Sequence, residues 1–198
     1  KMLSFAARRS LITQKCAAST YSGLTSADFL KKKTNEPILE YRKGSKERQD
    51  LEAALAFYSK NITEVPLRIG DKKITNKLEQ KQVIPSDHRS TLAKYTYATG
   101  EQIQEAIDVA LQARGAWERK PLKERAEILL RAADLAAGKY RMKLNASNYI
   151  IYELLEEAGM PPGILSFLPS DGPVFGDVIT ASPHLSAVNF TGSVPTFK

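Results

Sequence analysis

The 198-residue chain contains very little cysteine and histidine. Its single cysteine is Cys16, and it has only two histidines. One thiol near the start of the chain excludes a disulfide framework, a thiolate metal site and a cysteine nucleophile in everything that follows. No second histidine, cysteine or clustered carboxylate has metal-ligand spacing with His88, so we expect His88 to be a solvated loop residue. The sequence therefore predicts no metal site.

Acidic residues are absent before Asp28. The basic residues of this first stretch are Lys1, Arg8, Arg9 and Lys15, and its apolar ones include Leu3, Phe5, Leu11 and Ile12. A basic, acid-poor, amphipathic segment rich in Ser, Thr and Ala is typical of a mitochondrial transit peptide, and its apolar run is far too short to span a bilayer. We predict a transit peptide over residues 1–27, a location in the mitochondrial matrix and no membrane partner. A disordered basic arm is the alternative.

The positive charge is concentrated near the N-terminus. The formal net charge is +7, and four basic side chains of residues 1–27 supply much of it, followed by the basic stretch 31–48. Aromatic side chains are not interleaved with the basic ones in a stacking pattern, so the charge is weak support for nucleic acid. We predict no nucleic-acid partner, and a basic mitochondrial nucleic-acid binder is kept only as an alternative.

Residues 28–147 are predicted to form a region of helices and short strands. A first helix is expected behind Ser45 as N-cap. Its apolar residues at helical spacing are Leu51, Ala54, Leu55 and Tyr58. A hairpin is expected where residues 65–69 and 72–74 flank Gly70, although Pro66 restricts its first strand to an edge. A second strand pair, 83–85 with 92–97, is expected around a polar turn at 86–90.

Two longer helices follow in the same region. Thr99 and Gln102 make a capping-box pattern for a helix over 101–114, which Gly115 is expected to end, leaving Trp117 in the connection. Pro121 suits the start of the next helix, which is expected to end near Gly138. Its predicted core stripe consists of Leu122, Ala126, Leu129, Leu130 and Ala133.

Residues 148–198 have a different pattern, with short connections between helices and apolar strands. We expect a helix over 149–158 that stops at Gly159, a buried strand over 164–168, a loop over 169–176, a short helix over 177–181 and a strand over 187–190. This order is typical of a doubly wound parallel sheet, in which ligands bind at the carboxyl ends of the strands. Gly172, Gly176, Gly192 and Ser193 would then lie at one rim.

The last residues combine an apolar run, a turn of small residues and a proline. Gly192 allows a ligand to approach the backbone, Ser193 offers a hydroxyl, and Pro195 suits the first turn of a helix. The N-terminus of such a helix binds anions such as phosphate. Because this helix is not continued in the sequence, we expect the chain to be cut short.

Several tracts carry a resemblance to a known family. Residues 157–163 (EAGMPPG) and 189–193 (NFTGS) are similar to the aldehyde dehydrogenase superfamily. The tracts at 35–37, 44–48, 167–177 and 192–198 resemble the mitochondrial branch of it that oxidises L-glutamate γ-semialdehyde, the open form of 1-pyrroline-5-carboxylate. The resemblance covers nearly everything from residue 35 onward. It implies a partial aldehyde dehydrogenase fold of class α/β, with the N-terminal region joined to part of a nucleotide-binding sheet over 148–198.

The resemblance also implies an activity and a cofactor. The activity is NAD-dependent oxidation of L-glutamate γ-semialdehyde to glutamate in proline degradation, with a small aldehyde as substrate, in a homo-oligomeric family. By matching to the family, the residues that line the dinucleotide are Gly192, Ser193, Val194, Pro195 and Thr196, and those that flank its adenosine end are Gly172 and Gly176. The alternative is that these glycines only make turns.

Two departures from the family bear on activity. The family's catalytic cysteine and glutamate match no residue of this chain, so no catalytic residue is assigned and the chain itself is expected to be inactive. Residues 144–147 also run directly into residue 148, where the family has a long intervening segment that includes the first nucleotide-domain strands. A non-catalytic fragment that binds phosphate or a full-length partner is therefore the alternative to an enzyme.

Overall fold

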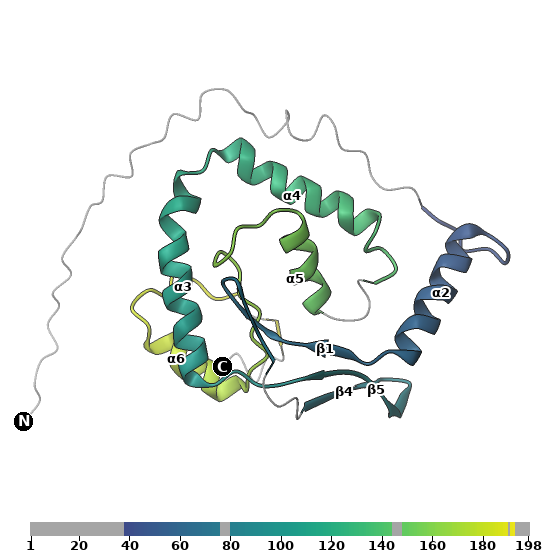
Figure 1. Ribbon diagram of the computed structural model, residues 1–198, viewed down its shortest axis with the longest axis horizontal. Coiled ribbons are helices and arrows are strands. Elements are labelled where there is room, and N and C mark those ends of the chain that lie inside the picture. The colour runs from purple at the N-terminus through teal and green to yellow at the C-terminus, as the bar shows by residue number, and fades with distance from the viewer. Residues whose placement is uncertain (1–37, 76–79, 144–147, 190, 193–198) are drawn as a thin grey trace, which may run out of the picture. The chain divides into compact units, whose positions relative to one another are not determined.

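The structure is a computed structural model that describes residues 38–75, 80–143, 148–189, 191 and 192, all within one compact unit, Glu36–Lys198. The expected transit peptide at 1–27 lies outside the described residues. The elements, in chain order, are α2 (Lys46–Lys60), β1 (Thr63–Val65), β2 (Leu67–Ile69), β3 (Lys72–Ile74), β4 (Gln80–Ile84), β5 (Asp87–Tyr95), α3 (Gly100–Arg119), α4 (Leu122–Ala137), α5 (Asn148–Glu157) and α6 (Gly172–Ala181) (Figure 1). The fold is mixed α/β, as the sequence predicted. Within the described ranges, no helix is both long and apolar enough to cross a bilayer.

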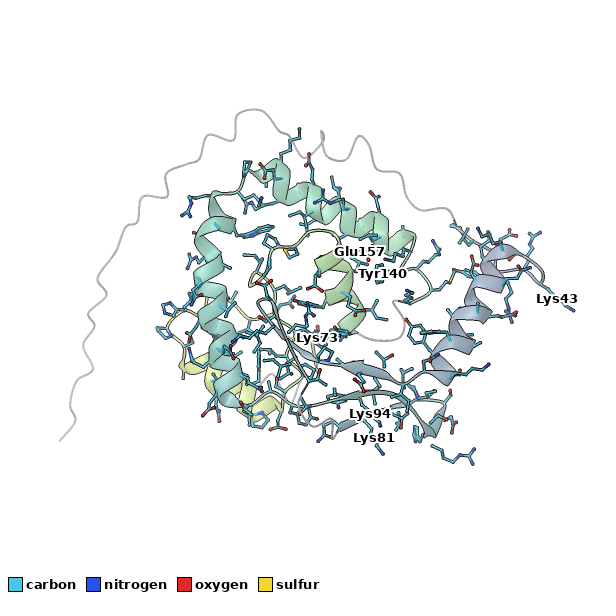
Figure 2. All side chains as sticks on the ribbon, in the orientation of Figure 1. Lys43, Lys73, Lys81, Lys94, Tyr140 and Glu157 are labelled. Atoms are coloured by element: carbon cyan, nitrogen blue, oxygen red, sulfur yellow. The ribbon has the colours of Figure 1, made fainter. Side chains whose placement is uncertain are left out.

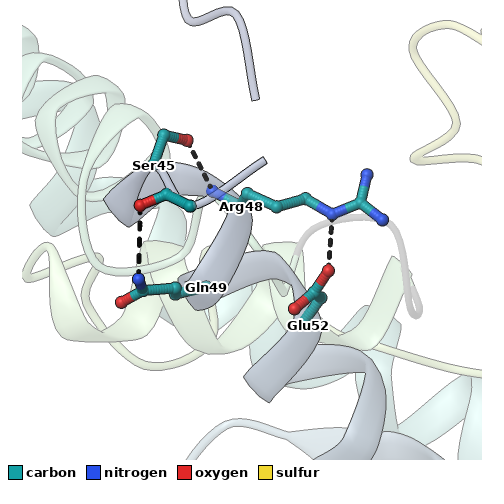
Figure 3. A network of polar contacts seen from close by, with 5 residues as sticks. Ser45, Arg48, Gln49 and Glu52 are labelled. Atoms are coloured by element: carbon teal, nitrogen blue, oxygen red, sulfur yellow. Dashed lines mark hydrogen bonds and ion pairs between the residues drawn. The ribbon is translucent and has the colours of Figure 1, made fainter. Parts of the chain in front are cut away.

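Helix α2 begins behind Ser45, as predicted. The Ser45 hydroxyl accepts a hydrogen bond from the backbone N–H of Arg48 at 3.3 Å, and the Arg48 side chain pairs with Glu52 at 2.6 Å (Figure 3). An N-cap of this kind is worth about 1 kcal/mol to the helix. None of the α2 side chains is buried. The helix is therefore held by its cap and local pairs more than by a packed apolar face.

The strands form two small sheets. The predicted hairpin is confirmed: β2 and β3 pair antiparallel around Gly70, whose φ is +56°. Pro66 separates β2 from β1, because proline has no N–H to give to a ladder, and β1 instead pairs in parallel with β5. Strand β4 pairs antiparallel with β5, which gives the order β1-β5-β4. A single proline thus switches the chain from one sheet to the next.

The turn between β4 and β5 is shorter than predicted. Ile84 already pairs with Asp87, so the turn consists of residues 85 and 86 alone. The Asp87 carboxylate accepts hydrogen bonds from the Ser90 hydroxyl at 2.7 Å and the Arg89 N–H at 3.3 Å. These polar residues stabilise the start of a strand, so the prediction of a loop was wrong. His88 is exposed in β5.

Helix α3 has the predicted start and a different end. The capping box is confirmed, with the Gln102 N–H donating to Thr99 Oγ1 at 3.3 Å and the Thr99 N–H donating to Gln102 Oε1 at 3.0 Å. The helix continues through Gly115, so Trp117 lies in its last turns. A glycine costs a helix interior only about 1 kcal/mol, whereas the residue before Pro121 is sterically pushed out of helical geometry. The proline therefore ends the helix.

Helix α4 also starts and ends as predicted, with Pro121 at the N-cap position and Gly138 at the C-cap. Its predicted core stripe is wrong. The buried residues are Ile128 and Ala132, whereas Leu129 is 55% exposed. The apolar arc of α4 is wide, and α5 packs against only one side of it. Sequence spacing identified the arc but not which side of it has a neighbour.

Residues 148–189 depart most from prediction. Helix α5 is confirmed and ends at Gly159, whose φ is +97°. No strand forms over 164–168, where Leu165 and Phe167 make only isolated pairings, with Pro162 and Arg68 respectively. Residues 187–189 form no strand either, and Phe190 lies outside the described residues. A strand needs a continuous ladder of hydrogen bonds to a neighbour, and the described residues of these two segments make only the isolated pairings above.

The apolar side chains gather in three clusters that join early and late parts of the sequence. One links α4 to α5, and a second sets Val65 and Ala93 against Tyr149 and Tyr152. The third packs α6 against residues of β2 and α3. Residues 144–147, which end at the expected domain boundary, lie outside the described residues, and that boundary stays a prediction.

A polar cluster closes the end of the α4–α5 pair. Glu157 accepts hydrogen bonds from the Tyr140 hydroxyl at 2.7 Å and from Lys139 Nζ at 2.7 Å (Figure 2). Burial raises the pKa of Tyr140 to about 12, and the bond to Glu157 adds to the shift. The bonds from Lys139 and Tyr140 lower the pKa of Glu157 below its usual 4.5.

We expect Glu157→Gln to destabilise the chain at neutral pH, because Glu157 binds its proton less tightly in the folded state than in the unfolded one. A lowered folded pKa gives stability that is present above pH 4.5 and is lost as the pH falls through the folded value. The difference in urea midpoint between wild type and variant should therefore narrow as the pH falls below 4.5. Glu64→Gln, at an exposed glutamate of β1, is the control. A difference that stays constant from pH 7 to acid would contradict this role.

Candidate cofactor-binding site

The structure describes three of the seven predicted dinucleotide residues. Gly192 is exposed and lies in a bend. Gly172 is the first residue of α6 and Gly176 lies one turn later, so α6 begins five residues before the helix predicted at 177–181. The other four predicted residues, Ser193, Val194, Pro195 and Thr196, lie outside the described residues.

The first turns of α6 present an open backbone surface. A Cβ atom added at Gly172 or at Gly176 would meet nothing within 4 Å. Asp171 takes the N-cap position without a side-chain capping bond, and Pro173 has no N–H. Because both glycines lack a side chain, a flat or polar group of a ligand can approach the helix backbone there. The assignment of Gly172 and Gly176 to the adenosine end of a dinucleotide stays a prediction, and both glycines lie in a helix rather than in the expected loop.

Neighbouring elements hold α6 in place. Its apolar side chains Phe175, Val178 and Ile179 pack against a cluster that includes the fully buried Leu67 and Ile103. The segment that leads into α6 is fixed by the Ala98 N–H, which donates to the Pro169 carbonyl at 2.8 Å. Helix α6, which carries the two open glycines, is thus packed against strand β2 and helix α3.

An apolar groove of about 680 Å³ lies beside α6. It runs between α3 and residues 182–187, which follow α6. Its apolar lining includes Ile107, Leu111, Trp117, Ile164 and Leu185, and its polar lining includes Arg114, Glu118, Ser182, His184 and Ser186. Arg114 and Glu118 are paired with each other, so the charged part of the lining is largely neutralised. A second hollow of about 380 Å³ shares part of the same walls.

The groove was not predicted from the sequence, because the apolar residues that line it were expected to lie in the core. Gly163 lies at its floor with a φ of +83°, and a Cβ there would be 3.0 Å from Ala113 and 3.1 Å from Val109. The chain therefore approaches α3 closely at Gly163, and a side chain there would collide with the helix. Ile164 and Ala187 belong to segments expected to be strands. Without strand neighbours, their side chains line an open surface.

The described residues offer little else for chemistry. No group of three or more His, Cys, Asp and Glu side chains comes together in the described ranges. His184 lines the groove, while His88 lies on β5. The geometry can accommodate a ligand along α6 and in the groove, and we assign no nucleophile or general base to it.

Comparison with known proteins places these features in a family. The model of the aldehyde dehydrogenase family matches residues 74–144 and 139–198. Mitochondrial delta-1-pyrroline-5-carboxylate dehydrogenase of Danio rerio is 28% identical over 259 residues, covering 83% of this chain and 47% of the zebrafish protein. The Homo sapiens protein of that name is 29% identical over 262 residues, covering 84% of this chain and 46% of its own. The chain spans about half the length of these relatives.

Solved structures share the fold. Delta-pyrroline-5-carboxylate dehydrogenase from Mycobacterium tuberculosis, bound with NAD, superposes with a TM-score of 0.78 at 24% identity, covering 83% of this chain and 49% of its own. The Thermus 1-pyrroline-5-carboxylate dehydrogenase with bound NAD gives a TM-score of 0.65 at 17% identity, covering 74% and 47%. These two structures are therefore similar to this chain in fold over most of its length.

The matches also locate a break. The family model matches in two pieces that meet at residues 139–144, just before the junction at 147–148. The zebrafish alignment spans 259 residues, more than the 198 that this chain contains, so the relative has a stretch with no counterpart here. Both findings agree with the intervening segment expected to be absent at that junction. The family model matches more than half of this chain, on both sides of the break. The chain therefore belongs to the aldehyde dehydrogenase family.

Proposed function

We propose that this chain is a partial 1-pyrroline-5-carboxylate dehydrogenase polypeptide. The corresponding activity is NAD-dependent oxidation of L-glutamate γ-semialdehyde to glutamate in proline degradation. The observation that carries the proposal is the alignment of 83% of the chain with a mitochondrial protein of that name. The M. tuberculosis structure of the same name, solved with NAD, supports the cofactor. The basic leader and the mitochondrial names of the relatives support a mitochondrial location, for which we propose the matrix.

The chain's contribution to this activity would be to bind and orient the cofactor. We assign Gly192, Ser193, Val194, Pro195 and Thr196 to the dinucleotide and Gly172 and Gly176 to its adenosine end. The open surface at the two α6 glycines supports this assignment, because a side chain there would keep a ligand away from the backbone. When bound, NAD accepts the hydride in aldehyde oxidation. We propose that these residues hold the dinucleotide.

Turnover needs a nucleophile that these 198 residues do not provide. In the superfamily a cysteine thiolate attacks the aldehyde, a step that a thiol must perform before hydride can leave. The single cysteine here, Cys16, lies in the leader predicted at 1–27. We therefore propose that the chain taken alone is inactive. A non-catalytic fragment that binds phosphate or a full-length partner is the second candidate, and the open α6 surface and groove favour it.

We expect the purified 198-residue chain to produce no NADH from L-glutamate γ-semialdehyde and NAD, because the family's nucleophilic cysteine matches no residue of this chain. NADH absorbance is measured beside the human relative as a positive control. Cys16→Ala should leave the result unchanged. Turnover that survives this substitution and the removal of host enzyme would contradict the proposed inactivity.

We expect weak NAD binding that depends on Gly192. Two or three backbone hydrogen bonds of about 1 kcal/mol each give at best a millimolar dissociation constant. In an NMR titration, Gly192→Val should remove the shifts near residue 192, because a β-branched side chain blocks close approach. Gly115→Ala, in α3, is the control and should bind as wild type does. Shifts confined to the basic stretch 31–48 and unaffected by Gly192→Val would show nonspecific charge attraction.

We expect residues 1–30, fused to a soluble reporter, to carry it into mitochondria. Replacing Arg8 and Arg9 with Glu should abolish import, because transit peptides need a basic, acid-poor face. Fluorescence imaging and protease protection of isolated mitochondria measure the import. A reporter that remains cytosolic behind the native segment would rule out the leader without affecting the family assignment.

A further inference from the structure

Helix α4 has a second apolar side whose residues are exposed or only half-buried. Ile128 and Ala132 pack toward α5, but another set of apolar residues runs along the helix beside them. This outer stripe consists of Leu122, Ala126, Leu129, Leu130, Ala133 and Ala137. Leu129 is 55% exposed and Leu122 is 38% exposed. Their spacing of three and four residues keeps them on one face from the first turn of α4 to the last.

The position of this stripe coincides with the break in the family match. Helix α4 ends at Ala137, and the two matched pieces meet at residues 139–144. The relatives therefore continue from this point with a stretch that the chain lacks. A surface helix with apolar residues on both sides of its arc is typical of one that packs between two neighbours. Here one neighbour, α5, is present.

We propose that the outer stripe of α4 is an interface with a second copy of this chain, the two α4 helices packing antiparallel about a two-fold axis. Such an interface requires a self-complementary surface. The stripe has this property, since reversing the helix about its middle sets Leu122 opposite Ala137 and Ala126 opposite Ala133. The bulky Leu129 and Leu130 lie at the centre. Large residues thus meet small ones at both ends.

The charges beside the stripe favour the same arrangement. Lys123 and Asp134 border one edge of the stripe, three turns apart, near opposite ends of α4. Antiparallel packing brings Lys123 of one copy toward Asp134 of the other, and the two-fold axis repeats the pair. Parallel packing would instead place the charged edges of the two copies on opposite sides of the interface. The Lys123 side chain is 67% exposed and lies 3.9 Å from Glu127, which leaves it able to reach across.

The surface area that two α4 helices can bury against each other sets the expected affinity of the dimer. A helix of 16 residues is about 24 Å long, and a single pair of such helices buries less than the roughly 1,200 Å² of a stable interface. The dimer should therefore be weak, with a dissociation constant in the micromolar range. This inference goes beyond the proposed function and does not rest on it.

Sedimentation equilibrium of the 198-residue chain from 5 to about 200 micromolar protein tests the interface, a range chosen to bracket a weak dimer. We expect a monomer–dimer equilibrium, and Leu129→Glu should weaken it at least about tenfold. Leu129→Ala, which removes apolar surface without adding charge, should weaken it less. The matched control is Leu55→Glu on α2, where the side chain is 59% exposed, and it should leave the equilibrium unchanged. Circular dichroism verifies that each variant is folded.

A charge exchange tests the antiparallel arrangement. Lys123→Glu and Asp134→Lys should each weaken the dimer about threefold or more, and the double variant should restore it, because the pair is re-formed with its charges exchanged. A chain that remains monomeric throughout the concentration range overturns the proposal. So does a dimer that Leu129→Glu leaves intact, or a double variant no better than either single one. Absence of self-association together with a mixed complex with the human relative would overturn it in favour of a full-length partner.

Discussion

Arg68 connects the early strands to the late part of the chain. Its backbone N–H and carbonyl each exchange a hydrogen bond with Phe167 at 3.0 Å, and its guanidinium pairs with Glu156 and lies 5.2 Å from the centre of the Tyr152 ring. The side chain is only 11% exposed. A guanidinium with so little access to water needs partners in fixed positions. The orientation of α5 and of the segment after it is therefore tied to β2.

The proposed cofactor residues depend on this connection. Phe167 lies just before Pro169, whose carbonyl accepts a hydrogen bond from the Ala98 N–H. Helix α6 begins soon after, at Gly172. Two backbone contacts within three residues thus fix where α6 starts and which way its open glycines face. A nucleotide-binding fold normally fixes the corresponding helices through neighbouring parallel strands. In the described residues the hairpin strand β2 and helix α3 perform that task.

The sequence predicted correctly those features that depend on interactions between residues close together in the chain. The Ser45 cap, the Thr99–Gln102 capping box and the stop at Gly159 each involve groups a few residues apart, so their patterns could be read directly. Signals that need a distant partner failed. The strand expected over 164–168 has the right composition, but in the described residues it pairs with β2 at Phe167 alone and forms no continuous ladder. The groove could not be foreseen either, since it lies between α3 and residues 182–187, which are far apart in the sequence.

The error at α4 shows what such patterns measure. The predicted stripe and the buried one are adjacent parts of a single apolar arc, and sequence spacing alone cannot say which part a neighbour will cover. In this chain α5 covers the part around Ile128 and Ala132 and leaves Leu129 exposed. The exposed part of the arc lies next to the break in the family match. The free energy of burying its apolar surface is therefore available to a second surface that fits it.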